Sequence, residues 1–286
     1  MLHGRTLKWS AWLGWQIESN WTTPWLFAGY VLLKPLAGSL LVVCMYWAAR
    51  AASGGATPSD FLPYLYISSA CFMVVAGVTS GMSNSVVTDR ESYKMLKYIR
   101  MSPIPLSTYL VGRGLARAGQ SALGGLLTVG VGWLIFPDLR SALGDHLIPW
   151  GWLVLNLTIG VVMLVAIGLM LSGTVLNMAR YGFFLSEGIA GLLYLLCGAV
   201  FPVDILPPWL RPLSLSLPPT YWLESMRRVL LGRPSAHAVL ADWNHGELFL
   251  LLAGATTVLV VAAHGYFRWS ERRAWLMGMY EESSGN

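Results

Sequence analysis

Charged side chains are scarce in this chain of 286 residues: Asp, Glu, Lys and Arg together account for 12% of it. Soluble domains carry roughly 25% charged residues, so the sequence has about half of the polar surface that water would require. Hydrophobic residues make up 55% of the chain. These proportions exclude a soluble enzyme, a disordered scaffold and a secreted disulfide-bonded module, and they indicate an integral membrane protein.

The sequence also lacks the short motifs of several enzyme classes. The patterns GxxxxGK[ST], GxSxG and HExxH are all absent, so neither a phosphate-binding loop nor these hydrolase sites are predicted. Cys44, Cys71 and Cys197 lie within apolar runs without metal-ligand spacing, where a thiol behaves as a small hydrophobic group. Basic residues form short clusters between apolar runs, which argues against nucleic acid binding. We expect no cofactor bound by this chain.

Six apolar stretches are long enough to cross a bilayer, which takes about 20 residues of helix. Helices are the expected form, because unpaired backbone groups cannot be left in lipid. The sequence therefore predicts an all-α integral membrane fold with spans at about 24–49, 61–86, 108–136, 148–172, 183–201 and 247–268.

The distribution of basic residues predicts the orientation of these spans. Twelve of the 19 Lys and Arg residues lie on the side of the membrane that holds both termini, and six lie on the other side. The remaining one, Lys34, lies inside the first span. The positive-inside rule then places both termini in the cytoplasm and the protein in the cell membrane.

Residues 1–23 are predicted to form an amphipathic helix at the membrane surface. Trp9, Trp12, Leu13 and Ile17 fall on one face at helical spacing, which is typical of a helix that lies in the interface plane. A frayed tail is the alternative. We assign residues 24–269 to the transmembrane domain and residues 270–286 to a cytoplasmic tail.

The loop at 87–107 is predicted to hold a short amphipathic helix over about 88–100. Thr88 or Asp89 would cap its start, and Pro103 would stop it. Such a helix, held between two spans, would give a soluble partner a rigid knob to bind. The alternative is a basic loop that only fixes topology. The predicted apolar patch consists of Met95, Leu96 and Ile99, and it is flanked by Tyr93, Lys94, Lys97 and Arg100.

The segment from 202 to 231 is too apolar for a solvated loop and too rich in proline for a span. We expect two short helices that dip into the outer leaflet, at about 204–214 and from Pro219 to about 231. Backbone of this kind must be protected by protein or line an aqueous cavity, so the segment is a candidate outer gate. The gate residues are predicted to be Phe201, Pro202, Pro218, Tyr221 and Glu224.

Polar residues within the spans are candidates for a transport path. Thr79, Ser80, Ser83 and Asn84 make the inner end of the second span polar without charge. Glu187 could pair with Arg113 or Arg117 across the third and fifth spans, but snorkelling of the arginines is the favoured explanation. Lys34 could snorkel or face a cytoplasmic cleft, and His264 is more readily explained by packing than by proton transfer.

The order of these parts resembles one family, the membrane subunit of type-2 ABC exporters. That family has an interfacial helix, six spans, a coupling helix after the second span and a re-entrant helix pair before the last. Its characteristic phrase in the re-entrant region matches this sequence at Phe201, Pro202, Leu206, Pro207, Trp209, Leu210, Leu217, Pro218, Thr220, Tyr221, Glu224, Arg227, Leu230 and Gly232.

The resemblance implies half of an exporter. A second permease subunit, identical or paralogous, would complete the path, and separate cytosolic ATPase subunits would bind ATP and Mg²⁺. The residues that would couple to the ATPase are Glu91, Tyr93, Lys94, Met95, Leu96 and Lys97.

The substrate class is predicted from the path candidates, which are uncharged and accompanied by many aromatic residues. They suit an amphipathic drug, an antibiotic or a lipid-like molecule. A polysaccharide or lipid-linked glycan is the alternative within the family. A membrane-embedded transferase and a structural subunit are the alternatives from other classes.

Overall fold

The computed structural model describes residues 2–19, 23–55, 61–144, 147–178, 181–232, 240 and 243–280. Within these ranges the chain is helical and forms no strands. The helices are α1 (Leu2–Ser19), α2 (Pro24–Ala52), α3 (Phe61–Glu91), α4 (Leu96–Met101), α5 (Leu106–Ile135), α6 (Pro137–Gly144), α7 (Trp150–Leu176), α8 (Gly182–Leu196), the 3-10 turn η1 (Val203–Ile205), α9 (Arg211–Leu215), α10 (Pro218–Leu231) and α11 (His245–Leu276).

Four helices among the described residues are long and apolar enough to cross a membrane: α3, α5, α7 and α11. They coincide with the second, third, fourth and sixth predicted spans. The first and fifth predicted spans coincide with shorter apolar helices, namely Leu36–Ala52 within α2, and α8. The all-helical, multi-pass membrane fold predicted from the sequence is thus confirmed, with four helices of full spanning length.

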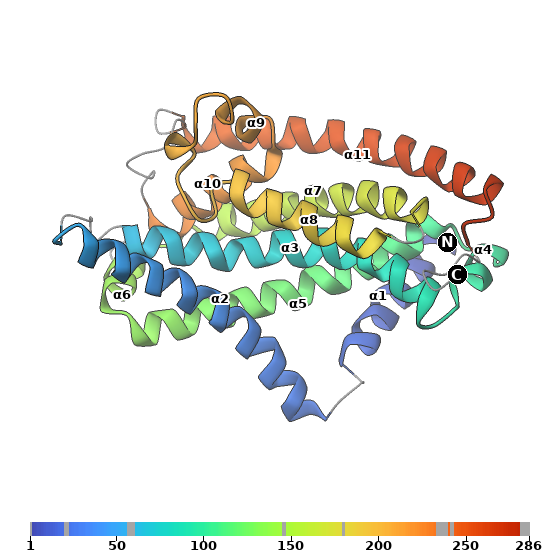
Figure 1. Ribbon diagram of the computed structural model, residues 1–286, viewed down its shortest axis with the longest axis horizontal. Coiled ribbons are helices and arrows are strands. Elements are labelled where there is room, and N and C mark those ends of the chain that lie inside the picture. The colour runs from blue at the N-terminus through green and yellow to red at the C-terminus, as the bar shows by residue number, and fades with distance from the viewer. Residues whose placement is uncertain are drawn as a thin grey trace.

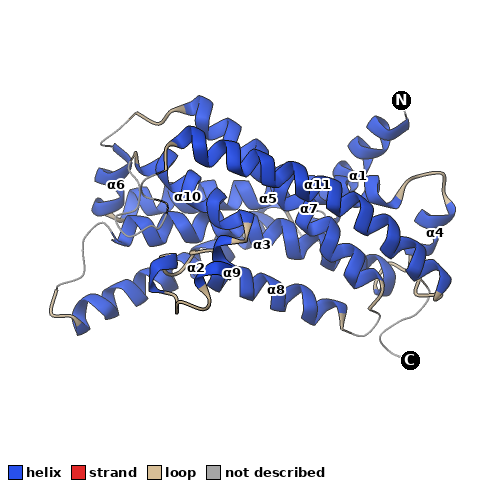
Figure 2. Cartoon of the chain, turned by 90° about the horizontal axis from the view of Figure 1, so that it is seen from above, coloured by secondary structure: helices blue, strands red, loops and turns tan. Residues whose placement is uncertain are grey.

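The long helices run along a common axis, and the short elements gather at its two ends (Figures 1 and 2). One end carries α1, α4 and the C-terminal end of α11, and we refer to it as the α4 end. The opposite end carries α6 and α10, and we refer to it as the α10 end. Helices α3, α5, α7, α8 and α11 therefore alternate in direction along the chain, and α7 and α11 run the same way because α8 lies between them.

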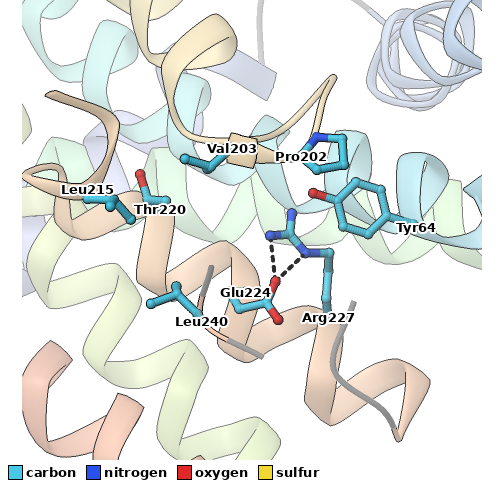
Figure 3. Close-up of a pocket in the computed structure, with 8 residues that line it drawn as sticks. All are labelled: Tyr64, Pro202, Val203, Leu215, Thr220, Glu224, Arg227 and Leu240. Carbon is cyan, nitrogen blue, oxygen red and sulfur yellow. Dashed lines mark hydrogen bonds and ion pairs between the residues drawn. The ribbon is translucent and has the colours of Figure 1, made fainter. Parts of the chain in front are cut away.

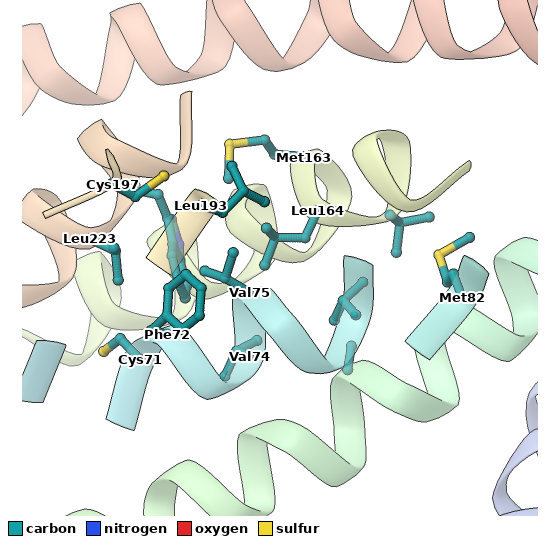
Figure 4. Close-up of a cluster of buried hydrophobic side chains, with 14 of the residues drawn as sticks. Cys71, Phe72, Val74, Val75, Met82, Met163, Leu164, Leu193, Cys197 and Leu223 are labelled. Atoms are coloured by element: carbon teal, nitrogen blue, oxygen red, sulfur yellow. The ribbon is translucent and has the colours of Figure 1, made fainter. Parts of the chain in front are cut away.

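Helix α3 is the centre of the bundle, and most of its residues are buried. Phe72 and Val75 of α3 belong to the same apolar core as Leu164 of α7, Leu193 of α8 and Leu223 of α10 (Figure 4). The close approach of the neighbouring helices depends on small residues. A Cβ atom added to Gly114 of α5 would lie 2.3 Å from the Met82 sulfur, and one added to Gly168 of α7 would lie 2.8 Å from it.

Helix α1 packs along α5 through small side chains. Ser10 and Gly14 are buried, and a Cβ atom added to Gly14 would lie 3.0 Å from the Cβ of Ala116. The predicted tryptophan face is exposed at Trp9 and Trp12, whose rings contact each other edge to face. The helix therefore has one face that packs on α5 and another that is exposed.

The single helix predicted over 88–100 is wrong. Helix α3 continues to Glu91, and the Thr88 hydroxyl donates to the Asn84 carbonyl inside it instead of capping a new helix. Asp89 is buried in the bundle, so it is not free to cap either. The chain then breaks, and only α4 forms a separate short helix. Its end before Pro103 agrees with the prediction.

The first of the two predicted outer helices is also wrong in detail. In place of one helix over 204–214, the chain forms the turn η1 and the five-residue α9. Pro207 and Pro208 explain the break, because proline has no N–H to donate and clashes with the preceding turn. The second predicted helix is confirmed as α10, which begins at Pro218, one residue earlier than expected.

Candidate functional site

The connection between α3 and α4 is a tight, backbone-bonded turn. The Tyr93 amide donates to the Thr88 carbonyl at 3.0 Å, and the Met95 amide donates to the Asp89 carbonyl at 2.9 Å. Lys94 adopts a left-handed conformation with a φ of 51°. A non-glycine residue rarely adopts this conformation, which costs roughly 1–2 kcal/mol. The surrounding bonds therefore hold α4 in a fixed position against the end of α3.

The side chains of this segment divide between core and surface. Leu96 is buried in the apolar core, Met95, Lys97 and Ile99 are partly buried, and Glu91 closes α3. The sequence therefore did not identify the surface apolar groups correctly, since Leu96 faces inward. The exposed groups that a partner could contact are Tyr93, Lys94, Tyr98, Met101 and Ile104. The i, i+3 spacing of Tyr98 and Met101 was the available signal.

A buried ion pair anchors the base of the turn. Asp89 and Arg113 are almost fully buried, and the Arg113 Nη1 donates to the Asp89 Oδ1 at 3.3 Å. The Tyr109 hydroxyl donates to the Asp89 Oδ2 at 2.9 Å and accepts from the Arg113 Nη1 at 3.2 Å. Both carboxylate oxygens thus have donors, which is what a buried charge requires. The turn is thereby fixed to α5.

Two more arginines extend this anchor to other helices. Arg90 donates through its Nη2 to the Met178 carbonyl at 3.0 Å, which joins α3 to the end of α7. Arg117 of α5 forms an ion pair with Glu18 of α1. The alternative in which Glu187 pairs with Arg113 or Arg117 is therefore wrong, since these arginines have other carboxylate partners. Glu187 instead accepts a hydrogen bond from the Asn84 Nδ2 at 3.1 Å.

The four polar residues predicted to line a path lie on different sides of α3. Thr79 and Ser83 are fully buried, and their hydroxyls donate to carbonyls of the preceding turn. Ser80 and Asn84 are partly exposed, and the Asn84–Glu187 bond extends this exposed stripe to α8. Of the four predicted path residues, Ser80 and Asn84 are therefore the two that are not fully buried in the bundle.

A second polar network lies at the α10 end, around Glu224 (Figure 3). The Glu224 Oε2 accepts from the Arg227 Nη2 at 2.8 Å, and its Oε1 accepts from the Arg228 Nε at 2.9 Å. Arg227 also donates at 3.0 Å to the Ser68 hydroxyl and to the Gly198 carbonyl. Arg228 donates to the carbonyls of Leu240 and Trp243. Through its two arginine partners, the Glu224 carboxylate thus links α10 to α3, to the end of α8 and to the segment before α11.

The other predicted gate residues surround this network. The Tyr221 hydroxyl donates to the Leu215 carbonyl at 2.6 Å and holds α9 against α10. Phe201 is exposed, and Pro218 is the first residue of α10. Pro202 lines a cavity together with Tyr64, Glu224 and Arg227 (Figure 3). The volume of this cavity, about 20 Å³, has room for about one water molecule.

Of the remaining intramembrane candidates, His264 is exposed on α11. The Lys34 side chain lies outside the described residues. The chain thus presents two buried, charged anchors at opposite ends of one bundle, and the anchor at the α4 end supports an exposed apolar surface.

Comparison with known proteins places the chain in context. A family model described as ABC-2 type transporter matches residues 8–231. This region begins in α1, ends with the last residue of α10 and includes the charged residues of both polar networks. No curated protein matches the chain.

Proposed function

The chain belongs to the ABC-2 type transporter family, and from this premise we propose that it is the permease subunit of an exporter driven by a separate ATPase chain. Membership makes it the membrane-spanning permease of an ABC transporter, and permease domains of this family generally partner with an ATPase subunit. The direction of transport, the assembly and the substrate are the parts that we propose.

The α3–α4 turn carries the proposal. It exposes Tyr98 and Met101 at the end of the bundle, although the turn beneath them is fixed by the buried Asp89–Arg113 pair. Exposed apolar side chains on a rigid support are typical of a docking site for a soluble partner. The ATPase would bind this surface and, through it, displace α3 and α5.

This assignment also sets the proposed orientation. The α4 end would lie in the cytoplasm, where the ATPase is found, and the α10 end would face outward. Both termini would then be cytoplasmic and the protein would reside in the cell membrane, in agreement with the distribution of basic residues.

A second permease subunit would complete the translocation path. The partly exposed stripe of Ser80 and Asn84 on α3, together with Glu187 on α8, would face this partner or the path. Glu187 is the charged member of this stripe, and α8 also exposes Phe183, Phe184 and Leu192. Such a surface suits an amphipathic drug, an antibiotic or a lipid-like substrate.

The proposed cycle depends on the difference in energy between two conformations. In this cycle, the conformation in which the Glu224 network is intact would be the state that has not opened outward. ATP binding by the partner would favour a state in which this network is rearranged, and only such differential binding can shift the equilibrium.

Purification from native membranes would test the proposal. We expect the chain to retain a protein with a phosphate-binding loop, and the complex to hydrolyse ATP in vesicles. Amphipathic compounds should raise the rate of ATP hydrolysis. An increase in this rate with glycans alone would favour the polysaccharide alternative. A purified chain that transports or converts a substrate without any ATPase would contradict the proposal.

A further inference from the structure

Helix α11 continues well beyond the predicted sixth span and then turns back on itself. The Met279 amide donates to the Ala274 carbonyl at 3.0 Å, and the Gly278 amide donates to the Trp275 carbonyl at 3.2 Å. Gly278 has a φ of +70°, which a side chain would strain. This pattern is a helix-ending turn that reverses the chain.

The reversal returns Tyr280 to the bundle. Tyr280 is only 8% exposed and belongs to the buried apolar cluster that contains Leu96 of α4. By contrast, Trp275, Leu276 and Met277, which precede it, are all exposed. The reversal therefore buries Tyr280, with the neighbouring Met279 partly buried against the same core.

An ion pair lies beside the same contact. The Arg100 Nη1 of α4 is 3.6 Å from the Glu271 Oε1 of α11. Burial raises the pKa of the Tyr280 phenol, the Glu271 carboxylate adds to this rise and the Arg100 guanidinium opposes it. All three groups are thus close together where α11 meets α4, and Figure 1 shows the end of α11 descending toward this region.

Helix α11 is itself fixed to α7 at this level. The Asn177 Nδ2 donates to the Ser270 hydroxyl at 2.5 Å, and the Ser270 hydroxyl donates to the Gly173 carbonyl. A displacement of α4 that reaches Glu271 would therefore reach α7 as well.

We propose that Glu271 and Tyr280 form a C-terminal clasp, meaning a pair of contacts that hold α4 in position. Through this clasp, α11 becomes a second route by which movement of the α3–α4 turn is transmitted into the bundle. The Tyr280 ring contributes buried apolar surface. The Arg100–Glu271 ion pair is partly exposed, and such a pair contributes little stability alone. Its role is therefore to fix the position of α4 along α11. This inference rests on the proposed function, because the movement would come from the ATPase.

The first test measures ATP hydrolysis by the purified complex of the permease and its ATPase. Tyr280→Ala should lower the maximum rate about threefold, the size of effect seen for residues that transmit coupling. The KM for ATP and the amount of bound ATPase should not change, because the nucleotide site lies in the other chain. Tyr280→Phe should behave as wild type, since the ring and not the hydroxyl fills the core.

Charge reversal tests the Arg100–Glu271 ion pair independently of Tyr280. Arg100→Glu and Glu271→Arg should each lower the maximum rate, and the double variant should restore it. Leu276→Ala, on the exposed side of the same turn, is the matched control and should have no effect. Normal rates in all of these variants would overturn the clasp. Should Tyr280→Ala fail to assemble, the charge variants carry the test.

A distance measurement tests the clasp independently of the proposed function. Spin labels at Met101 and Leu276, both exposed, would be introduced in a Cys44→Ser background, because Cys44 is the exposed free cysteine and Cys71 and Cys197 are buried. We expect a narrow distance distribution that broadens in Tyr280→Ala. An unchanged distribution would overturn the clasp, whereas failure to find any ATPase would overturn the proposed function and leave this reading valid.

Discussion

Glu224 is the acceptor on which the α10 end depends. It receives hydrogen bonds from Arg227 and Arg228, and all three side chains are buried. Removing the charge of one partner leaves the others buried without compensation. We expect Glu224→Gln to lower the free energy of unfolding by about 3–5 kcal/mol, measured by thermal and denaturant unfolding in detergent.

The control for this variant is Asp138→Asn, which removes a carboxylate from an exposed position on α6 at the same end of the bundle. It should change stability by less than about 0.5 kcal/mol. Equal stability of Glu224→Gln and Asp138→Asn would show that the buried network is not needed for folding.

Gly160 of α7 offers a sharper test of packing. A Cβ atom there would lie 2.0 Å from the Trp222 Nε1, which donates to the Asn156 carbonyl at 2.9 Å. Gly160→Ala should therefore displace the indole and cost about 1–3 kcal/mol. Gly151→Ala in the same helix meets nothing within 4 Å and should be tolerated. Melting curves and tryptophan fluorescence of both variants would check this, and equal melting would contradict it.

These residue-level partners were only partly predictable. The i, i+3 and i, i+4 spacing of Glu224 with the two arginines is visible in the sequence, so a local carboxylate–guanidinium contact could be expected. Arg113 is different. Asp89 lies on α3, which packs closely against α5, whereas Glu187 lies on α8, which packs against α3 and α7. The arrangement of the helices therefore decides that Arg113 meets Asp89.

At the scale of elements, the boundary between α3 and α4 shows how burial overrides a capping signal. Thr88 and Asp89 have the composition of a helix start. Because Arg113 and Tyr109 bind the Asp89 carboxylate, however, the residue is more stable inside α3 than at a new N-terminus. The partner residues lie 20 and 24 positions away, and a local pattern contains no information about them.

Near the same boundary, the residue that stabilises the fold differs from the residue that would dock the ATPase. Met101 is 81% exposed, whereas Leu96 is buried. Met101→Asp should therefore change stability by less than about 0.5 kcal/mol, yet weaken retention of the ATPase, because it adds charge to an apolar contact. Leu96→Ala should cost about 2–5 kcal/mol through the cavity it creates.

Unfolding in detergent and co-purification with the ATPase would distinguish these effects. The proposed docking surface would be wrong if Met101→Asp retained the ATPase as well as wild type does. Leu147→Asp, an equally exposed change near the other end of the bundle, is the control.

At the scale of the whole molecule, run length predicted where the helices lie because lipid imposes a minimum length on every span. It could not predict how they pack. The contact of α1 with α5 depends on Ser10 and Gly14, which have no apolar signal, and the central position of α3 depends on glycines in its neighbours. Close packing of small residues is a property of pairs of helices, and single segments do not reveal it.

The orientation of the bundle yields the last prediction. Tyr98 at the α4 end and Leu147 in the α6–α7 connection are both exposed, so a cysteine at either position can react. In a Cys44→Ser background, a membrane-impermeant maleimide should label Leu147→Cys in intact cells and Tyr98→Cys only in inverted vesicles. The reason is that the α4 end holds the basic residues that the cytoplasmic side retains. Labelling of Tyr98→Cys from outside would show that the bundle has the opposite orientation, with the α3–α4 turn on the side that no ATPase could reach.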